Sequence, residues 1–120
     1  MHYLIFPDDE WEGKNNEHWV AWDNTESPVG FCSLRPIRHE SAVFLSRAGV
    51  LPCARGNRLQ RRFIAVREAW ARRNDFGVAL TYCLYENHSS LANLIKSGYR
   101  LYEPEYQWVG RDVHYFIKEL

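Results

Sequence analysis

The clearest structural signal in the chain is the stretch VLPCARGNRLQRR, residues 50–62. An apolar run over residues 42–51 predicts a strand, which ends at Pro52. A short turn with one glycine follows, and a helical pattern begins near Arg58. A strand that turns directly into a helix presents unpaired backbone N–H groups and the positive end of the helix dipole at one place. Because such a place binds phosphate, the stretch predicts a phosphate-binding turn.

The turn resembles the acetyl-CoA signature of the GNAT acetyltransferase superfamily, Val-x-Pro-x-x-Arg-Gly-x-Gly-x-Gly. Four residues match it in register: Val50, Pro52, Arg55 and Gly56. Arg58 and Gln60 stand where the family prefers glycine or alanine. Glycine at these positions lets a pyrophosphate approach the backbone closely. The backbone N–H groups of the turn are present whatever the side chains.

A second segment is similar to the family's Asn-x-x-Ala-x-x-x-Tyr-x-x-x-Gly-Phe motif. NHSSLANLIKSGY, residues 87–99, has its length and its end points. The resemblance covers residues 19–120 and implies an N-acetyltransferase. Such an enzyme moves an acetyl group from acetyl-CoA to an amine, here a protein, a peptide or a small amine. The cofactor-binding residues implied by the two motifs are Val50, Leu51, Arg55, Gly56, Asn57, Arg58, Leu59, Gln60, Arg61, Asn87 and Ser90.

Charge is unevenly distributed along a chain whose net charge is zero. Residues 55–73 contain seven arginines and one acid, Glu68, so they carry +6 and the rest of the chain carries −6. A basic helix of this kind is a feature of nucleic-acid-binding proteins. Contact with the phosphates of a duplex favours a basic excess over the whole domain, so nucleic acid ranks low as a partner. The phosphates of coenzyme A explain the arginines nearest the turn better.

Apolar periodicity outlines the other elements. Strands are predicted over residues 2–6, 19–22, 29–34, 42–51, 78–82, 99–102 and 113–118, and helices over residues 58–74 and 89–97. Pro36 and His39 mark an expected loop before the strand 42–51. Along the first helix, spacings of four, three and four place an apolar stripe on one face: Leu59, Phe63, Val66 and Trp70.

Strand 42–51, helix 58–74 and strand 78–82 form a βαβ unit, so the two strands should run parallel. A ligand then belongs at their carboxyl ends, beside the start of the helix. The family resemblance implies that these strands splay apart and that the pantetheine arm lies in the gap. We therefore predict an α/β (α+β) fold, a mixed and mostly antiparallel GNAT-type sheet with a parallel βαβ core. A single domain should span residues 1–120.

Family members usually have two helices between their first and second strands. Only 12 residues separate Phe6 from Trp19, so these N-terminal helices should be reduced. The acceptor side should then be open. An open side suits a protein or peptide terminus, or a wall supplied by a second subunit of a homodimer, better than an enclosed small molecule.

The catalytic groups are harder to assign. The family's usual proton donor, a tyrosine of the second motif, maps to Leu94. Tyr82, Tyr85 and Ser90 are substitutes, although each tyrosine is equally typical of a ring packed in the core with its hydroxyl at the surface. A missing acid need not abolish turnover, because a thiolate is a tolerable leaving group near neutral pH. Tyr82 is the candidate acid that we retain.

Glu40 is the carboxylate nearest to the central strand, residues 43–50 of which contain no acid. It is the candidate general base, acting through water, although an exposed loop carboxylate is an equally good interpretation. A backbone N–H at Val50 or Leu51 should polarise the thioester carbonyl. His39, His88 and His114 are spread too widely along the chain to define a site by spacing.

Composition narrows the class of protein. The 120 residues are 46% hydrophobic and 25% charged, which is ordinary for a globular domain. No apolar run reaches the roughly 20 residues of a membrane span, and the N-terminus lacks the pattern of a signal peptide. Three cysteines without Cys-x-x-Cys spacing indicate neither disulfides nor a metal site, and so a cytoplasmic location. The alternative to an enzyme is a catalytically silent CoA-binding interaction protein.

Overall fold

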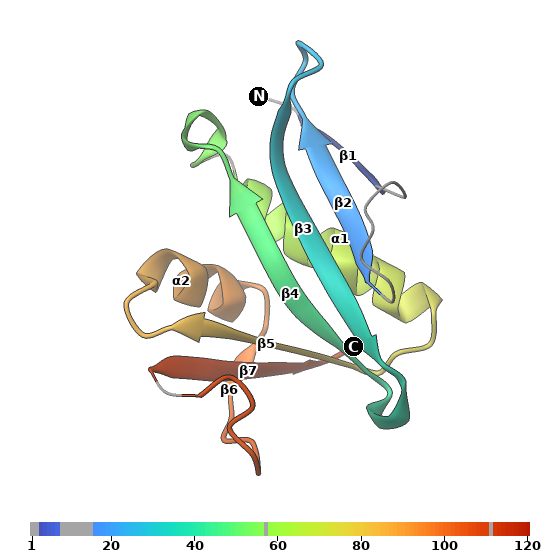
Figure 1. The fold of residues 1–120 in the computed structure, drawn as a ribbon, viewed down its shortest axis with the longest axis vertical. Coiled ribbons are helices and arrows are strands. Elements are labelled where there is room, and N and C mark those ends of the chain that lie inside the picture. The colour runs from blue at the N-terminus through green and yellow to red at the C-terminus, as the bar shows by residue number, and fades with distance from the viewer. Residues whose placement is uncertain (1–2, 8–15, 57, 111) are drawn as a thin grey trace.

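A seven-stranded sheet in the order β1-β2-β3-β4-β5-β7-β6 forms the centre of the protein (Figure 1). The structure, a computed structural model, describes residues 3–7, 16–56, 58–110 and 112–120. The strands are β1 (Leu4–Pro7), β2 (Glu17–Trp22), β3 (Pro28–Ile37), β4 (Ala42–Val50), β5 (Val78–Leu84), β6 (Arg100–Leu101) and β7 (Val113–Glu119). The helices are α1 (Leu59–Arg73) and α2 (His88–Lys96), and two 3-10 turns are η1 (Arg38–Glu40) and η2 (Pro52–Ala54). No helix in this described part of the chain is long and apolar enough to cross a membrane.

The pairing of the strands confirms the predicted fold class. β4 and β5 run parallel, as the βαβ pattern requires, and the other neighbouring strands pair antiparallel. The predicted strand 42–51 and helix 58–74 correspond to β4 and α1 within one residue at each end. Of the 12 residues between Phe6 and Trp19, where the N-terminal helices should be reduced, Pro7 ends β1 and residues 17–18 begin β2, and residues 8–15 lie outside the described residues.

One boundary prediction was wrong. Pro36 does not mark a loop, because β3 continues to Ile37 and Pro36 pairs with Val43 of β4. The pairing of β2 with β3 ends at Leu34. Beyond that residue β3 is therefore an edge strand, where a missing backbone N–H is tolerated.

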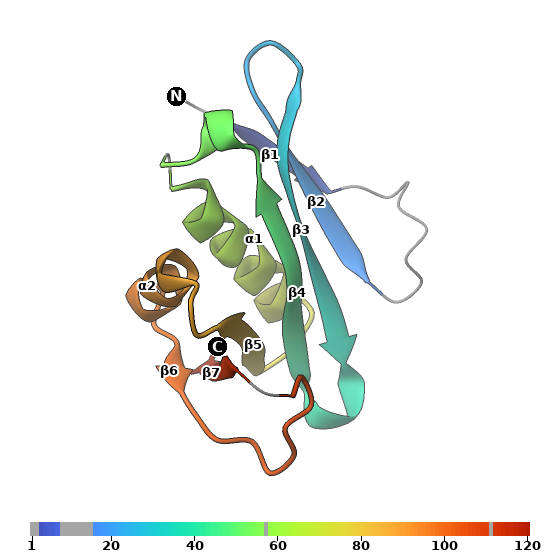
Figure 2. The same ribbon diagram turned by 60° about the vertical axis from the view of Figure 1, so that its left-hand side comes forward.

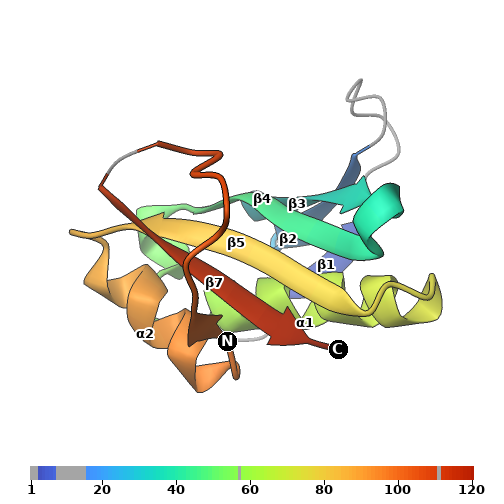
Figure 3. The same ribbon diagram turned by 90° about the horizontal axis from the view of Figure 1, so that it is seen from below.

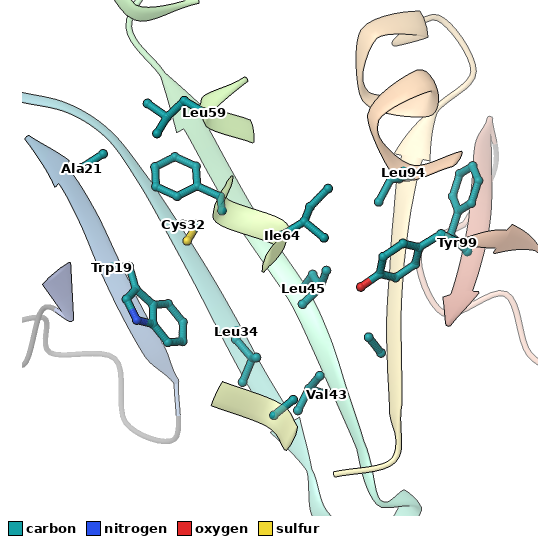
Figure 4. Packing of buried hydrophobic residues seen from close by; sticks show 14 of the residues in the cluster. Trp19, Ala21, Cys32, Leu34, Val43, Leu45, Leu59, Ile64, Leu94 and Tyr99 are labelled. Atoms are coloured by element: carbon teal, nitrogen blue, oxygen red, sulfur yellow. The ribbon is translucent and has the colours of Figure 1, made fainter. Parts of the chain in front are cut away.

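Helix α1 covers one face of the sheet and supplies the largest part of its core (Figures 2 and 4). Strand residues alternate, so Val43 and Leu45 point toward α1 whereas Phe44 lies on the opposite face. From the helix, Leu59 and Phe63 are buried as predicted, and Val66 and Trp70 pack at the margin. At Gly30 an added Cβ would lie 2.8 Å from the Gly49 carbonyl oxygen and 3.2 Å from the Phe63 ring. The absent side chain therefore allows α1 to approach β3 closely.

Arg67 joins the middle of α1 to β3 through a buried guanidinium. Its Nε donates to the Phe63 carbonyl at 3.0 Å and its Nη1 donates to the Ser33 carbonyl at 3.1 Å. Burial lowers the pKa of this guanidinium. The neighbouring thiol of Cys32 is fully buried, and burial raises its pKa to about 12.

Glu68, the next residue on α1, joins this helix to the other half of the sheet. The Tyr99 hydroxyl donates to Oε2 at 2.8 Å, and Lys118 Nζ on β7 donates to Oε1 at 3.0 Å. Lys118 Nζ also donates to the Ser97 carbonyl at 2.7 Å, just after α2. Burial and the adjacent carboxylate raise the pKa of Tyr99, which keeps its hydroxyl protonated as a donor.

We predict that Glu68→Ala lowers the free energy of unfolding by about 3 kcal/mol, because removing one member of a buried ion pair leaves the other without compensation. Urea denaturation measures the loss. Arg72→Ala is the matched control. Arg72 also lies near Glu68, at 3.7 Å, but its side chain is 51% exposed, so this change should cost less than about 1 kcal/mol. Equal losses in the two variants would contradict the prediction.

We predict that stability falls with rising pH above pH 9, in part through Cys32. Its thiol ionises near pH 9.0 in the unfolded chain but near pH 12 in the folded protein. Between these values the unfolded state binds fewer protons, so the free energy of unfolding decreases by up to about 1.4 kcal/mol per pH unit. Denaturation of Cys32→Ala between pH 7 and 10 in reductant should give a shallower decline. The difference in the free energy of unfolding at pH 7 measures the packing cost of the substitution. If the free energies of the variant and the parent protein decline in parallel with pH, Cys32 does not contribute to the decline.

Candidate functional site

The two central parallel strands separate after three paired positions. The pairs are Ala42 with Val78, Val43 with Ala79 and Phe44 with Leu80. At the end of this ladder the Thr81 hydroxyl, instead of a backbone N–H, donates to the Leu45 carbonyl at 3.0 Å. Beyond it β4 and β5 diverge, and α2 lies beside the opening (Figure 1). This opening, which we call the fork, is the predicted gap between splayed strands.

A continuous groove runs from the fork to the start of α1. A cavity of about 480 Å³ at the fork is lined by residues 45–48 of β4 and residues 81–84 of β5. A second cavity of about 650 Å³ lies at the predicted phosphate-binding turn. The two cavities share five lining residues: Ala48, Gln60, Asn87, Ser89 and Asn93. A ligand that occupies both would touch the turn, the edge of β4 and the start of α2.

Two residues in the left-handed backbone conformation define the predicted phosphate-binding turn. Gly56 has φ +82°, and an added Cβ there would meet nothing within 4 Å. Glycine is therefore favoured at this position by its left-handed backbone conformation, and not by a lack of room for a side chain. Arg58 has φ +60° although it carries a side chain, and it is the N-cap of α1. Asn57, between them, lies outside the described residues.

The start of α1 presents donors and positive charge to the groove. Arg58 makes no side-chain capping bond, and the Arg62 N–H donates to the Arg58 carbonyl at 3.1 Å. The N–H groups of the three preceding helical residues have no helical acceptor: Leu59, Gln60 and Arg61. Four cations line this part of the groove, and no carboxylate is among its described lining residues. These cations are Arg55, Arg58, Arg61 and Lys96.

The edge of β4 offers backbone groups to the same groove. The Leu51 N–H donates to the Val29 carbonyl at 2.8 Å, so it is already used within the sheet. Arg55 Nε donates to the Val50 carbonyl at 3.4 Å, on the side away from β3. Because backbone groups alternate along a strand, the N–H groups of Val50 and Ala48 face the groove. Of the two donors suggested by the sequence, Val50 is therefore suitably oriented and Leu51 is not.

The start of α2 shows the predicted cap. The Ser90 N–H donates to Asn87 Oδ1 at 3.0 Å, which is an N-cap bond. Asn87 lines both cavities of the groove and Ser90 lines the cavity at the fork, so the capping role does not remove them from the site. Leu94 is 5% exposed within the core, and the position where the family has a tyrosine therefore carries no proton donor.

The loop that joins β6 to β7 passes over the face of the sheet opposite α1 (Figure 3). Aromatic side chains from this loop and from the sheet form a pocket. The pocket has a volume of about 940 Å³. Phe44 stacks on Tyr82 with ring centres 6.0 Å apart, and Trp108 from the loop meets both rings edge-on, at 5.1 and 5.9 Å. Tyr82 lines both this pocket and the groove at the fork. It therefore stands where the two faces of the sheet communicate.

Glu40, the candidate base, lies at the other end of this aromatic pocket. Its side chain is 57% exposed and 3.8 Å from His39. It precedes Ala42, which lies three residues before Leu45, or about 10 Å along an extended strand. Direct transfer of a proton from an amine at the fork to Glu40 is therefore out of reach.

Sequence reasoning missed a polar cavity of about 540 Å³ beside Tyr82, on the same face as the aromatic pocket. His18, Ser33, Ser46 and Arg47 are among its lining residues. The alternation of side chains along β2 could have revealed this cavity. Because Trp19 is buried in the core on the α1 side, its neighbour His18 must lie on the opposite face of the sheet. Among the described residues no group of His, Cys, Asp and Glu is suited to hold a metal ion.

Comparisons with known proteins agree with this architecture. A protein of Klebsiella pneumoniae that was assigned as an acyl-CoA N-acyltransferase superposes with a TM-score of 0.83 and 17% identity, over 98% of this chain and 97% of that one. An IAA acetyltransferase of Bacillus cereus superposes with a TM-score of 0.83 and 14% identity, over 99% of this chain and 100% of that one. The PaiA N-acetyltransferase of Thermoplasma acidophilum, in complex with coenzyme A, superposes with a TM-score of 0.77 and 13% identity, over 88% of this chain and 62% of that one.

A search among curated proteins finds no match. The family comparison matches residues 1–99 to the Acetyltransferase (GNAT) family, a range that includes both the predicted phosphate-binding turn and the whole of the second motif, residues 87–99. With the parallel strands that fork beside the N-terminus of α1, this match identifies the protein as an N-acetyltransferase: the chain belongs to the GNAT acetyltransferase family, whose reaction moves an acetyl group from acetyl-CoA to an amine.

Proposed function

We propose that the groove holds acetyl-CoA along its length and that an amine acceptor reaches the thioester from the aromatic pocket. One observation carries this proposal. The fork connects the two faces of the sheet, and Tyr82 lines the cavity on each side. A thioester at the fork and an amine in the aromatic pocket would therefore meet at Tyr82.

The turn suits the phosphates of the cosubstrate. The first three N–H groups of α1 have no helical acceptor, and the four cations of this cavity face no carboxylate among its described lining residues. Both features favour a diphosphate. The edge of β4 at Ala48 and Val50 then offers its amides to the pantetheine arm, and Asn87 and Ser90 flank the thiol end.

The aromatic pocket favours an amine that carries an apolar group. Its lining is largely aromatic and aliphatic, and its charged groups include the carboxylates of Glu40 and Glu105 and the guanidinium of Arg35. A cationic amine gains from aromatic faces and from the carboxylates, whereas an acidic acceptor would meet two like charges. A small amine and the side chain of a peptide lysine both fit this description.

For the chemical step, we assign Tyr82 as the proton donor to the departing thiolate and the groove-facing N–H groups of β4 as the partners of the thioester oxygen. A second subunit would pack against β1, where Leu4 and Phe6 are exposed. The three free cysteines support a reducing, cytoplasmic location.

A catalytically silent CoA-binding protein is the second candidate function. Leu94 occupies the position of the family's tyrosine, and the described residues that line the groove include no carboxylate to act as a base. This candidate predicts that acetyl-CoA binds and that no amine is acetylated.

Arg58→Gly should weaken acetyl-CoA binding by about 10-fold or more, because a charge-assisted contact to phosphate contributes roughly 1.5–3 kcal/mol. Glycine retains the left-handed backbone, so the variant should be at least as stable as the parent protein. Titration calorimetry measures affinity and thermal unfolding measures stability. Arg73→Gly, at the far end of the same helix, is the control for charge and should bind normally. If both variants bind like the parent protein, the phosphate site is misplaced.

Acetyl transfer is tested with labelled acetyl-CoA and three amines: phenethylamine, spermidine and a lysine-containing peptide. We expect acetylation of at least one of these amines. Tyr82→Phe should lower kcat by about 10-fold or more and leave the affinity for acetyl-CoA unchanged, because only the proton donor is lost. Binding of acetyl-CoA without transfer to any of these amines would replace the enzyme with the silent binding protein.

A further inference from the structure

Three side chains with exchangeable protons line the cavity beside Tyr82. The cavity shares Phe44 and Tyr82 with the aromatic pocket, so it adjoins the place where the acceptor amine would lie. Its described lining includes His18, Ser33 and Ser46, and no carboxylate. These three residues come from β2, β3 and β4, which are neighbours in the sheet.

A bulge in β4 brings the two hydroxyls together. Cys32 pairs with Ala48 and Leu34 pairs with Leu45, so residues 46 and 47 together face Ser33. Ser33 Oγ lies 2.7 Å from Ser46 Oγ and accepts a bond from the Arg47 N–H at 3.1 Å. A serine hydroxyl is both a donor and an acceptor, so adjacent hydroxyls of this kind can pass a proton.

His18 continues the row. It is the cross-strand partner of Ser33 in the β2–β3 ladder, and cross-strand Cβ atoms on one face lie about 5 Å apart. An imidazole is the side chain whose ordinary titration range lies nearest to neutral pH. It is therefore suited to receive a proton that the two hydroxyls pass on.

We propose that Ser46, Ser33 and His18 form a proton relay that converts the bound acceptor from its ammonium form to the reactive amine. This inference rests on the proposed function of the fork. It supplies a base that acts in place of Glu40. Ser46 is on β4 at the fork, and its neighbours Leu45 and Arg47 line the groove, so it is the member of the row nearest to the thioester.

In the proposed reaction, proton transfer from the acceptor precedes its attack on the thioester. The ammonium gives one proton to Ser46 Oγ, Ser46 gives its proton to Ser33, and Ser33 gives its proton to the His18 imidazole. The nitrogen lone pair then forms the C–N bond at the thioester carbonyl carbon, and the C–S bond breaks with its electron pair on sulfur. A second proton from the nitrogen, delivered through Tyr82, yields the thiol of CoA. The imidazolium releases its proton to solvent.

Charged and titratable groups around His18 come from three strands. They are Arg35 on β3, Arg47 on β4 and Tyr82 on β5, all of which line the cavity. β1, the other neighbour of β2, carries no titratable side chain in Leu4–Pro7.

The relay is tested by the pH profile of kcat/KM for phenethylamine at saturating acetyl-CoA. In His18→Gln and Ser46→Ala, kcat/KM at pH 7 should fall about 100-fold. It should then rise about tenfold per pH unit, because each variant depends on amine that is already neutral. The parent protein should show a flatter profile. His88→Gln, an exposed histidine at the start of α2, is the matched control and should follow the parent protein.

Thermal unfolding and acetyl-CoA calorimetry accompany these assays, so that a folding defect is recognised. A His18→Gln variant that unfolds early is replaced by His18→Asn. Folded variants with the profile of the parent protein would overturn the relay and leave the acetyltransferase intact. Absence of turnover in the parent protein would overturn the proposed function and the relay together.

Discussion

The early end of the β4–β5 ladder is the constraint on which the rest of the structure depends. After Phe44 and Leu80 the two strands no longer pair, and the Thr81 hydroxyl closes the gap by bonding to the Leu45 carbonyl. Beyond that bond the amides on one side of β4, those of Ala48 and Val50 among them, face an opening instead of a neighbouring strand. Unsatisfied buried amides are costly, so the opening must contain water or a ligand. The groove, its access from both faces and the central position of Tyr82 all follow from this single interruption.

A divided sheet needs a connection elsewhere, and the Glu68 cluster provides it. Helix α1 packs on β3 and β4, whereas β7 belongs to the half of the sheet that contains β5. The carboxylate of Glu68 accepts hydrogen bonds from Tyr99 and Lys118, and it thereby holds the two halves at a fixed separation. Arg67 acts in the same way within one half, because it ties α1 to the Ser33 carbonyl at the bulge. The width of the groove is thus determined by buried polar bonds on the helix side of the sheet.

Local features of the sequence were sufficient for the fold and for the position of the turn before α1. A strand, a turn with Gly56 and an apolar helical stripe are neighbours in the chain, so their spacing predicts the βαβ unit directly. Features that depend on register were not predictable in this way. The meeting of Ser33 and Ser46 requires a bulge that no local pattern indicates, and the aromatic pocket joins Phe44 to Trp108 from a distant loop. The role of Glu40 as a base acting through water stays a prediction, because distance in the sequence does not reveal how far this carboxylate lies from the fork.

The fork also gives a strand in the middle of the sheet an open edge. From Leu45 to Val50, β4 is a central strand by position, but one of its sides is as open as an edge strand. Open strand edges are templates for pairing between chains, and proteins commonly protect them. Any molecule that lies along β4 in the groove shields this edge and stabilises the folded chain by mass action. Occupancy of the groove is therefore coupled to the solubility of the protein, and depletion of its ligand would favour self-association through an interior strand.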